Sequence, residues 1–204
     1  MRPERGVRVR AEQARSRDTR KQIMDAAVAV LVDHGYSNAT TVRIQEAAGV
    51  SRGGLLHHYP SRDALLVAAV HHLALAAVRD IGREEEWPSD PTARIGTAID
   101  LMWSHFRQPY FWASMELWLA ARAHNELRAA LLPVEKALGQ TIKDQTDTFF
   151  GVELRSAPRY VELRDLLLAS MRGIALTYAI DPRDPLLEPQ LEVWRHQAMA
   201  ALLG

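Results

Sequence analysis

The chain is predicted to fold entirely as α-helices, about nine of them, over its 204 residues. Three observations support this all-α class. Apolar residues recur three and four positions apart, which gathers them on one face of a helix. No segment shows the alternation of apolar and polar residues that marks a half-buried strand. Glycine and proline separate the periodic segments, at the points where helices are expected to stop and start.

Residues 1–17 contain six arginines and show no hydrophobic periodicity. We expect a disordered or loosely helical basic arm in this stretch. Beside a DNA-binding segment, such an arm is suited to contact phosphates or the minor groove. The alternative interpretation is a solvated tail that has no partner.

A first short helix is predicted at residues 42–48. Thr40 or Thr41 is suited to cap its start, because a hydroxyl oxygen accepts a hydrogen bond from a free N–H group of the first turn. Gly49 follows the helix, and glycine permits the positive φ with which many helices end.

A second short helix is predicted directly after this turn, capped by Ser51 and running to about His58. Pro60 stops it, since the residue before a proline disfavours the helical conformation. Two helices joined by a turn of three or four residues that contains glycine form the helix-turn-helix pattern. In that motif the second helix enters the major groove of DNA with its N-terminal end first.

The other helices follow from the same periodicity and the same stop signals. Gly35 is expected to end the first of them, and a loop is expected at residues 84–91, where an acidic run meets two prolines. The predicted ranges are 18–34, 62–83, 93–107, 109–123, 126–150, 158–180 and 191–203.

The stretch AAGVSRGGLLHHYPSRDALL, residues 47–66, resembles the helix-turn-helix of the tetracycline-repressor-like (TetR) family of bacterial transcription regulators. The resemblance covers roughly residues 18–68, and the rest of the chain is similar only in its length and helical character. Two positions depart from the family pattern, Gly54 for a frequent threonine and Leu56 for a frequent aromatic residue. The resemblance implies nine helices, a homodimer, double-stranded operator DNA as partner and a small-molecule effector.

Arg52 is the second residue of the predicted recognition helix, where an arginine can reach guanine O6 and N7 with two parallel hydrogen bonds. The alternatives are a phosphate contact or a solvated side chain. Gly53 and Gly54 are poor helix formers, which is consistent with a close approach of the backbone to DNA or with a simple loop. The expected DNA-binding residues are Thr40, Thr41, Ser51, Arg52, Gly53, Gly54, His57, His58, Tyr59 and Arg62.

No metal or other cofactor is expected. His57 and His58 are neighbours in sequence, as are His71 and His72, and adjacent side chains on a helix point about 100° apart. Such pairs do not converge on one ion. By the family resemblance His58 and Arg62 meet phosphates, whereas a tyrosine at position 59 more often packs beneath the motif.

Six of the 14 aromatic residues fall within residues 102–118. This clustering predicts an aromatic-lined pocket for a small apolar or aromatic molecule, with His105 and Glu116 as orienting polar groups. The alternative is an ordinary core stripe. The predicted pocket residues are Trp103, Phe106, Tyr110, Phe111, Met115, Trp118, Phe149 and Met171.

Two C-terminal helices are predicted to form a dimer interface, because one carries a stripe of small residues and the other an apolar face. By the family resemblance these helices pair with their copies as a four-helix bundle. The predicted interface residues are Leu166, Ala169, Gly173, Thr177, Leu191, Trp194, Ala198 and Leu202.

Charge and composition favour a regulator over an enzyme. Residues 1–63 carry a net charge of +4 and residues 64–204 one of −4, which suits a DNA-binding head on a body with another task. The chain has no cysteine and none of the common phosphate-loop, nucleophile or zinc-hydrolase motifs. The default location is cytoplasmic, with no membrane contact, because no apolar run is long enough to cross a bilayer.

We therefore expect a basic arm (1–17), a helix-turn-helix DNA-binding domain (18–63) and an effector-binding and dimerisation domain (64–204). The expected function is a DNA-binding transcriptional regulator, a repressor released from its operator by the effector. The alternative is a helical ligand-binding or adaptor protein that no longer binds DNA.

Overall fold

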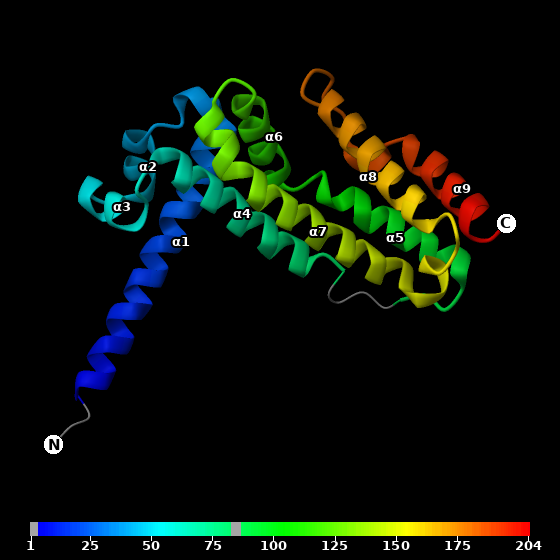
Figure 1. Cartoon of the computed structure of the whole chain (residues 1–204), viewed down its shortest axis with the longest axis horizontal. Coiled ribbons are helices and arrows are strands. Elements are labelled where there is room, and N and C mark those ends of the chain that lie inside the picture. Colours follow the sequence, from blue (N-terminus) through cyan, green and yellow to red (C-terminus); the bar gives the residue numbers. More distant parts are fainter. Residues whose placement is uncertain (1–3, 83–86) are drawn as a thin grey trace. The chain divides into compact units, whose positions relative to one another are not determined.

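The computed structural model describes residues 4–82 and 87–204, with side chains from residue 16 onward (Figure 1). These residues form nine α-helices and one short 3-10 helix, and the described ranges contain no strand, so the all-α prediction is confirmed. The elements are α1 (Glu4–Asn38), α2 (Thr41–Ala48), α3 (Arg52–His58), α4 (Arg62–Asp80), α5 (Pro91–His105), α6 (Pro109–Ala121), α7 (Asn125–Arg155), α8 (Tyr160–Thr177), η1 (Pro185–Leu187) and α9 (Gln190–Leu202).

The helices are grouped in two compact units. Unit 1 contains the chain up to Ala74 together with residues 112–135, and unit 2 contains residues 75–111 and 136–204. Residues 112–135, which we call the α6–α7 hairpin, therefore belong with the helix-turn-helix, a grouping that differs from the expected boundary at residue 63. The cause is packing, because Leu117, Leu127 and Leu131 are buried in the same apolar cluster as the core of the first four helices.

The largest departure from the predicted helices is the start of α1, which lies at Glu4 instead of residue 18. The expected arm is thus helical from residue 4, and residues 1–3 lie outside the described part. Alanine, glutamate, glutamine and arginine are strong helix formers, so a helix needs no apolar face there. Gly35 has a φ of 71°, the predicted stop, after which the chain completes a further turn to Asn38.

The remaining helices lie within a few residues of their predicted ranges. α4 ends at Asp80, before its predicted end, and the acidic residues 84–86 lie outside the described part of the chain. α8 stops at Thr177, and the predicted proline-rich loop contains η1.

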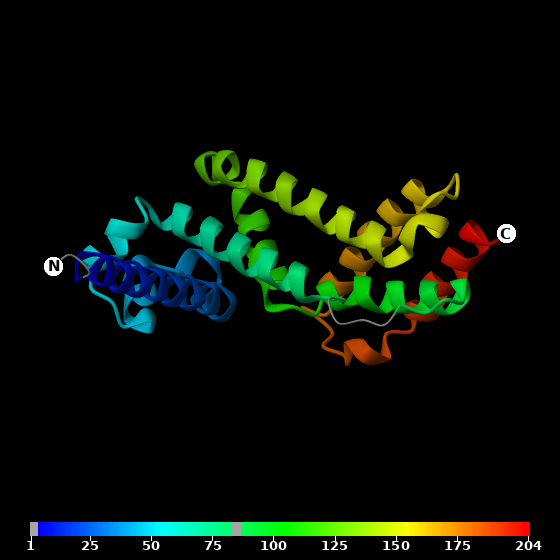
Figure 2. The same ribbon diagram turned by 90° about the horizontal axis from the view of Figure 1, so that it is seen from below.

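In unit 2, α9 lies beside α5 and α8 (Figure 2). The helical path of α7 breaks at Gly151, which has a φ of 75°. There the Arg94 side chain donates hydrogen bonds of 3.0–3.1 Å to the carbonyl oxygens of Thr148, Phe149 and Phe150. A Cβ atom at Gly151 would lie 2.7 Å from Arg94 Nη2, so glycine is needed for this contact as well as for its φ.

Within the described residues no single helix is long and apolar enough to cross a membrane, although α3 and α4 reach that length and composition as a pair bent by 69°.

Candidate nucleic-acid interface and ligand-binding residues

The caps predicted for the two short helices are present. Thr40 Oγ1 accepts from the N–H of Arg43 at 3.3 Å, and Ser51 Oγ accepts from the N–H of Gly54 at 3.1 Å. Gly49 has a φ of 63°, and its N–H closes the end of α2. The buried side chains of Ile44 and Leu55 anchor α2 and α3 to the unit 1 core, which fixes the orientation of the exposed face of α3.

The exposed face of α3 contains Arg52, Gly53, Leu56 and His57. The Arg52 side chain makes no hydrogen bond or ion pair with the described residues, so its five N–H donors are available. Leu56 is 47% exposed beside it and was not predicted as a contact residue. An apolar side chain on a recognition helix can pack against a thymine methyl group. Leu56 follows Arg52 by one helical turn, and this spacing could have predicted it as a contact residue.

The two glycines of α3 are not required by the fold. Neither has a positive φ. A Cβ atom at Gly53 would meet nothing within 4 Å, and one at Gly54 would make only an ordinary 3.4 Å contact with Ser51 Oγ. Both glycines lie in a regular helix, so the loop alternative is wrong.

Tyr59 does not lie on the exposed face. Its side chain is 3% exposed, and its hydroxyl accepts from Arg20 Nε at 3.3 Å. The hydrophobic ring packs against the unit 1 core beneath α3, so we assign Tyr59 a supporting position in place of the expected DNA contact.

Arg62 is only partly available to a phosphate. Its guanidinium lies 4.2 Å from the Tyr36 ring centroid, Nη1 donates to the Tyr36 carbonyl, and Nε donates to Asp63 at 3.2 Å. The Tyr36 hydroxyl donates to the same carboxylate at 3.0 Å, and burial together with this bond raises the pKa of Tyr36. A phosphate contact by Arg62 stays a prediction.

Glu116 is part of the same network. Its Oε2 accepts from the Tyr36 backbone N–H at 3.1 Å. Glu116 was expected to orient a ligand, but the structure uses it to link α6 to the end of α1, beside the Gly35 turn. This contact lies within unit 1 and joins the α6–α7 hairpin to the helices that carry the residues predicted to face DNA.

The predicted pocket residues are divided between the two units. Met115 and Trp118 lie in unit 1 and the other six in unit 2. In unit 2 Trp103 packs against Phe106 and Trp194 with centroid separations of 5.9 and 5.4 Å, and Phe106 packs edge-on against Phe111 at 5.4 Å. The Trp103 indole N–H donates to the Pro185 carbonyl at 2.7 Å. These rings form part of the packed interior of unit 2, and ligand binding there stays a prediction.

A buried polar pair lies beside these rings. His105 is 3% exposed, its Nδ1 lies 2.8 Å from the Tyr110 hydroxyl, and its Nε2 has no hydrogen-bond partner among the described residues. Burial lowers the pKa of His105 to about 4, although the polar side chain of Gln145 acts to raise it. Burial also raises the pKa of Tyr110. The Gln145 amide donates to the carbonyl oxygens of Val78 and Ile81 at the end of α4.

Trp118 lines a different feature from the one predicted. It borders a surface groove of about 310 Å³ within unit 1, formed by the two helices of the α6–α7 hairpin. Sequence reasoning missed this groove, since its residues come from two helices and no local pattern connects them. The lining residues are Trp118, Ala121, Arg122, Arg128, Leu131, Leu132 and Glu135.

The predicted dimer face is available on α8 but not on α9. Leu166, Ala169, Gly173 and Thr177 are exposed along α8. On α9, however, Leu191, Trp194 and Ala198 are at most 9% exposed, and Leu202 is partly buried. The apolar face of α9 packs within its own chain, so this half of the prediction is wrong; the exposed side of α9 carries Val193, Gln197 and Ala200 instead.

No group of three or more histidine, aspartate or glutamate side chains is placed to hold a metal ion in the part of the chain that the structure describes.

Comparison with known proteins relates the helix-turn-helix segment of this chain to a family of bacterial regulators. The family model described as bacterial regulatory proteins, tetR family, matches residues 23–69. The HTH-type transcriptional repressor Rv1474c of Mycobacterium tuberculosis is 30% identical over 120 residues, which cover 53% of this chain and 64% of that repressor. The chain thus spans less than two thirds of this curated relative.

Solved structures resemble the chain over most of its length. The putative transcriptional regulator SCO7518 from Streptomyces coelicolor A3(2) aligns with a TM-score of 0.66 and 17% identity, covering 91% of this chain and 99% of that one. The multidrug binding protein EbrR complexed with ethidium aligns with a TM-score of 0.61 and 22% identity, covering 90% and 97%. At these identities the similarity concerns the fold.

Proposed function

Since the chain belongs to the TetR family of bacterial regulatory proteins, we propose that it is a transcriptional repressor that binds operator DNA and leaves it when an effector binds. This role is regulatory and not enzymatic, and it places the protein in the cytoplasm with the DNA. The observation that carries the proposal is the exposed start of α3, where Arg52 has no partner among the described residues and Gly53 has open space beside it.

DNA is bound by a homodimer. Two copies of α3, about 34–36 Å apart, enter successive major grooves of a near-palindromic operator. Arg52 reads a guanine with two hydrogen bonds, and Leu56 packs against a neighbouring thymine methyl group. Thr40, Thr41 and His58 contact phosphates, which position the head without reading the sequence.

The effector is a small apolar or aromatic molecule bound among the aromatic residues of α5 and α6 in unit 2. His105 supplies a polar contact, since its Nε2 is buried and has no partner among the described residues. The alignment with a protein that was solved with ethidium supports an aromatic ligand class for this fold.

Operator binding is tested first, by selecting bound duplexes from a random DNA pool and measuring their affinity. Arg52→Ala is expected to weaken binding by about 1–3 kcal/mol and to relax the preference at one base position per half-site. Arg107→Ala removes an exposed arginine of unit 2 and is the matched control. Unchanged affinity and base preference in Arg52→Ala would show that Arg52 does not read DNA.

The salt dependence of the same binding separates a repressor from an adaptor protein. Contacts with several phosphates release counterions, so the logarithm of the association constant falls steeply and linearly with the logarithm of the salt concentration. An adaptor without DNA binding shows no such slope, and that result would refute the proposed function.

A further inference from the structure

The groove of the α6–α7 hairpin has the make-up of a small-molecule site. One wall is the end of α6 with Trp118 and Arg122, and the other is the start of α7 with Arg128, Leu131 and Leu132. Its volume of about 310 Å³ lies at the lower end of the range for ligand pockets, roughly 300–1,000 Å³. All of its lining residues lie in unit 1, whereas the aromatic residues of α5 belong to unit 2.

The surface of the groove is mostly apolar. Trp118 is 36% exposed and Leu132 is 52% exposed, while the neighbouring Leu131 forms a buried floor. Large apolar side chains that gather in a concave surface and stay in contact with water favour the binding of an apolar body.

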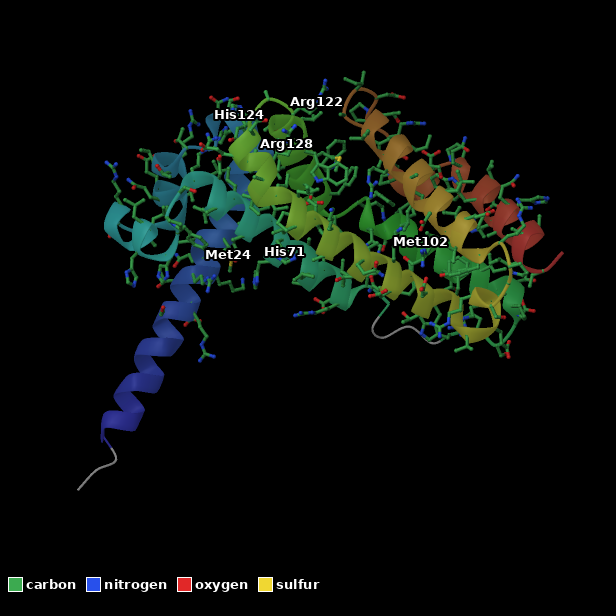
Figure 3. All side chains as sticks on the ribbon, viewed as in Figure 1. Met24, His71, Met102, Arg122, His124 and Arg128 are labelled. Carbon is green, nitrogen blue, oxygen red and sulfur yellow. The ribbon has the colours of Figure 1, made fainter. Side chains whose placement is uncertain are left out.

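Two cations stand at one end of this apolar surface, where α6 turns into α7 (Figure 3). The Arg122 side chain makes no hydrogen bond or ion pair with the described residues. Arg128 donates to Asn125 Oδ1 at 2.9 Å, but this partner is a neutral amide and leaves the positive charge uncompensated. Glu135 follows Arg128 by two helical turns, about 10 Å along α7, so the two cations and the carboxylate lie toward opposite ends of the groove.

We propose that this groove binds a small amphipathic anion, a carboxylate with an unbranched or aromatic apolar body. The carboxylate is held at the α6–α7 turn by Arg122 and Arg128, whose guanidinium groups can each form paired hydrogen bonds with it. The apolar body lies along Trp118 and Leu132. The site and its ligand class do not depend on DNA binding.

A second copy of the chain is a poorer occupant than an anion. In a two-fold contact the same patch meets itself. Such a contact would bury Arg122 and Arg128 either beside their own copies, which is costly for unpaired charges of one sign, or opposite Glu135 of the copy. The second arrangement offers one carboxylate to two cations, and Glu135 already has an interaction of its own. An anion brings negative charge to the α6–α7 turn, where Arg122 and Arg128 lie.

The test is calorimetric titration of the whole protein with octanoate and with octanamide, its uncharged counterpart. We expect octanoate to bind once per chain and octanamide at least about tenfold more weakly, since a hydrogen bond to a charged group is worth about 1.5–3 kcal/mol. Arg122→Gln should weaken octanoate binding by a similar factor and leave octanamide unchanged. Leu132→Asp should remove octanoate binding, because it places a carboxylate on the apolar wall.

Two controls protect this test from a loss of fold. Arg107→Gln removes an exposed arginine outside the groove and should leave octanoate binding unchanged. Leu132 is largely exposed, so Leu132→Asp should keep the thermal unfolding midpoint of the parent. The proposal is overturned if octanoate does not bind at millimolar concentration, if octanamide binds equally well, or if both groove variants bind octanoate like the parent. It is likewise overturned if octanoate fails to bind while Leu132→Asp alone splits a dimer, which would assign the groove to a second copy.

Discussion

Arg52 and Gly53 are adjacent at the start of α3, and neither contributes a visible contact to the fold. Gly53 has no positive φ, and a Cβ atom there would meet nothing within 4 Å. Glycine in a helix costs roughly 0.5–1 kcal/mol relative to alanine. Because Gly53 weakens its helix without easing any internal contact, we propose that something outside the chain comes close to its backbone, and that in this predicted recognition helix the partner is DNA.

Gly53→Ala is therefore expected to change stability and DNA binding in opposite directions. The free energy of unfolding should rise by up to about 1 kcal/mol, because alanine favours the helix. Operator affinity should fall by about 1–3 kcal/mol, because the new methyl group overpacks the interface. Urea unfolding and fluorescence anisotropy measure the two effects. Gly139→Ala, at another helical glycine with open space, should raise stability alone; full operator affinity in Gly53→Ala would contradict the close approach.

Because His105 is buried, we predict that the free energy of unfolding falls in mild acid. Burial lowers its pKa to about 4 in the folded chain, against 6.5 in the unfolded one. Between these two pKa values the unfolded state binds a proton that the native state excludes. The contribution of the neutral His105 to the free energy of unfolding is therefore complete above pH 6.5 and is lost as the pH falls toward 4. The difference corresponds to about 3 kcal/mol.

The measurement compares urea unfolding of the parent and His105→Gln at pH 7 and pH 4.5. Tyr110, Gln145 and Phe149 face the imidazole and carry no positive charge, so the variant should lose less stability on acidification than the parent. If both proteins lost the same free energy of unfolding between pH 7 and pH 4.5, the pKa of His105 would not be lowered in the folded state.

At the level of elements, the caps of α2 and α3 could be predicted because they depend on neighbouring residues alone. Thr40, Gly49 and Ser51 act within three or four positions of themselves, and the structure confirms all three. The start of α1 was missed for the opposite reason. A hydrophobic face was taken as the sign of a helix, whereas residues 4–17 are helical without one.

The apolar face of α9 shows where such local reasoning ends. Periodicity identifies the face but not the surface that covers it, and the dimer prediction assigned it to a second copy. In the structure Trp194 packs against Trp103 of α5 in the same chain, with centroids 5.4 Å apart. The exposed stripe on α8 has no such intramolecular cover, so the dimer prediction now rests on Leu166, Ala169, Gly173 and Thr177.

Gly173→Leu is predicted to weaken or abolish the dimer. A Cβ atom at this exposed position would meet nothing within 4 Å in its own chain, so we expect the variant to fold. A partner helix packed closely against the glycine would be displaced by the larger residue. Sedimentation at micromolar concentration should show a dimer for the parent and more monomer for the variant. Gly139→Leu, on α7, is the matched control, and a monomeric parent would contradict the whole interface.

For the whole molecule, the sequence placed one boundary at residue 63, but the compact units divide the chain elsewhere. Residues 112–135 were assigned to the effector-binding domain because they come after residue 63. In the structure, however, Leu117 and Leu131 are buried in the core of the first four helices. This difference matters for regulation. The first turn of α6 contains Tyr110 and Phe111 of the predicted effector site, and the same helix carries Glu116, which accepts from the Tyr36 N–H. Tyr36 in turn contacts Arg62 and Asp63, the first two residues of α4.

We propose that an effector at the predicted site acts on unit 1 through α6, because this one helix carries both Phe111 and Glu116. An effector that binds among the aromatic residues shifts DNA binding only if it has different affinities for the DNA-competent and DNA-incompetent states. A coupling of about 1–3 kcal/mol is typical of such systems. Moving the start of α6 would move Glu116 with it, because both lie on one helix.

Phe111→Leu should consequently reduce the effector response and leave operator affinity intact. The probe is a compound chosen from apolar and aromatic molecules for its release of the operator, and the response is the ratio of operator dissociation constants with and without it. Phe111 packs against Phe106, so the milder leucine limits the loss of packing that alanine would cause. Leu154→Ala, elsewhere in the interior of unit 2, should lower stability yet keep the response. If Phe111→Leu responds like the parent, the aromatic residues are an ordinary core and the effector binds elsewhere.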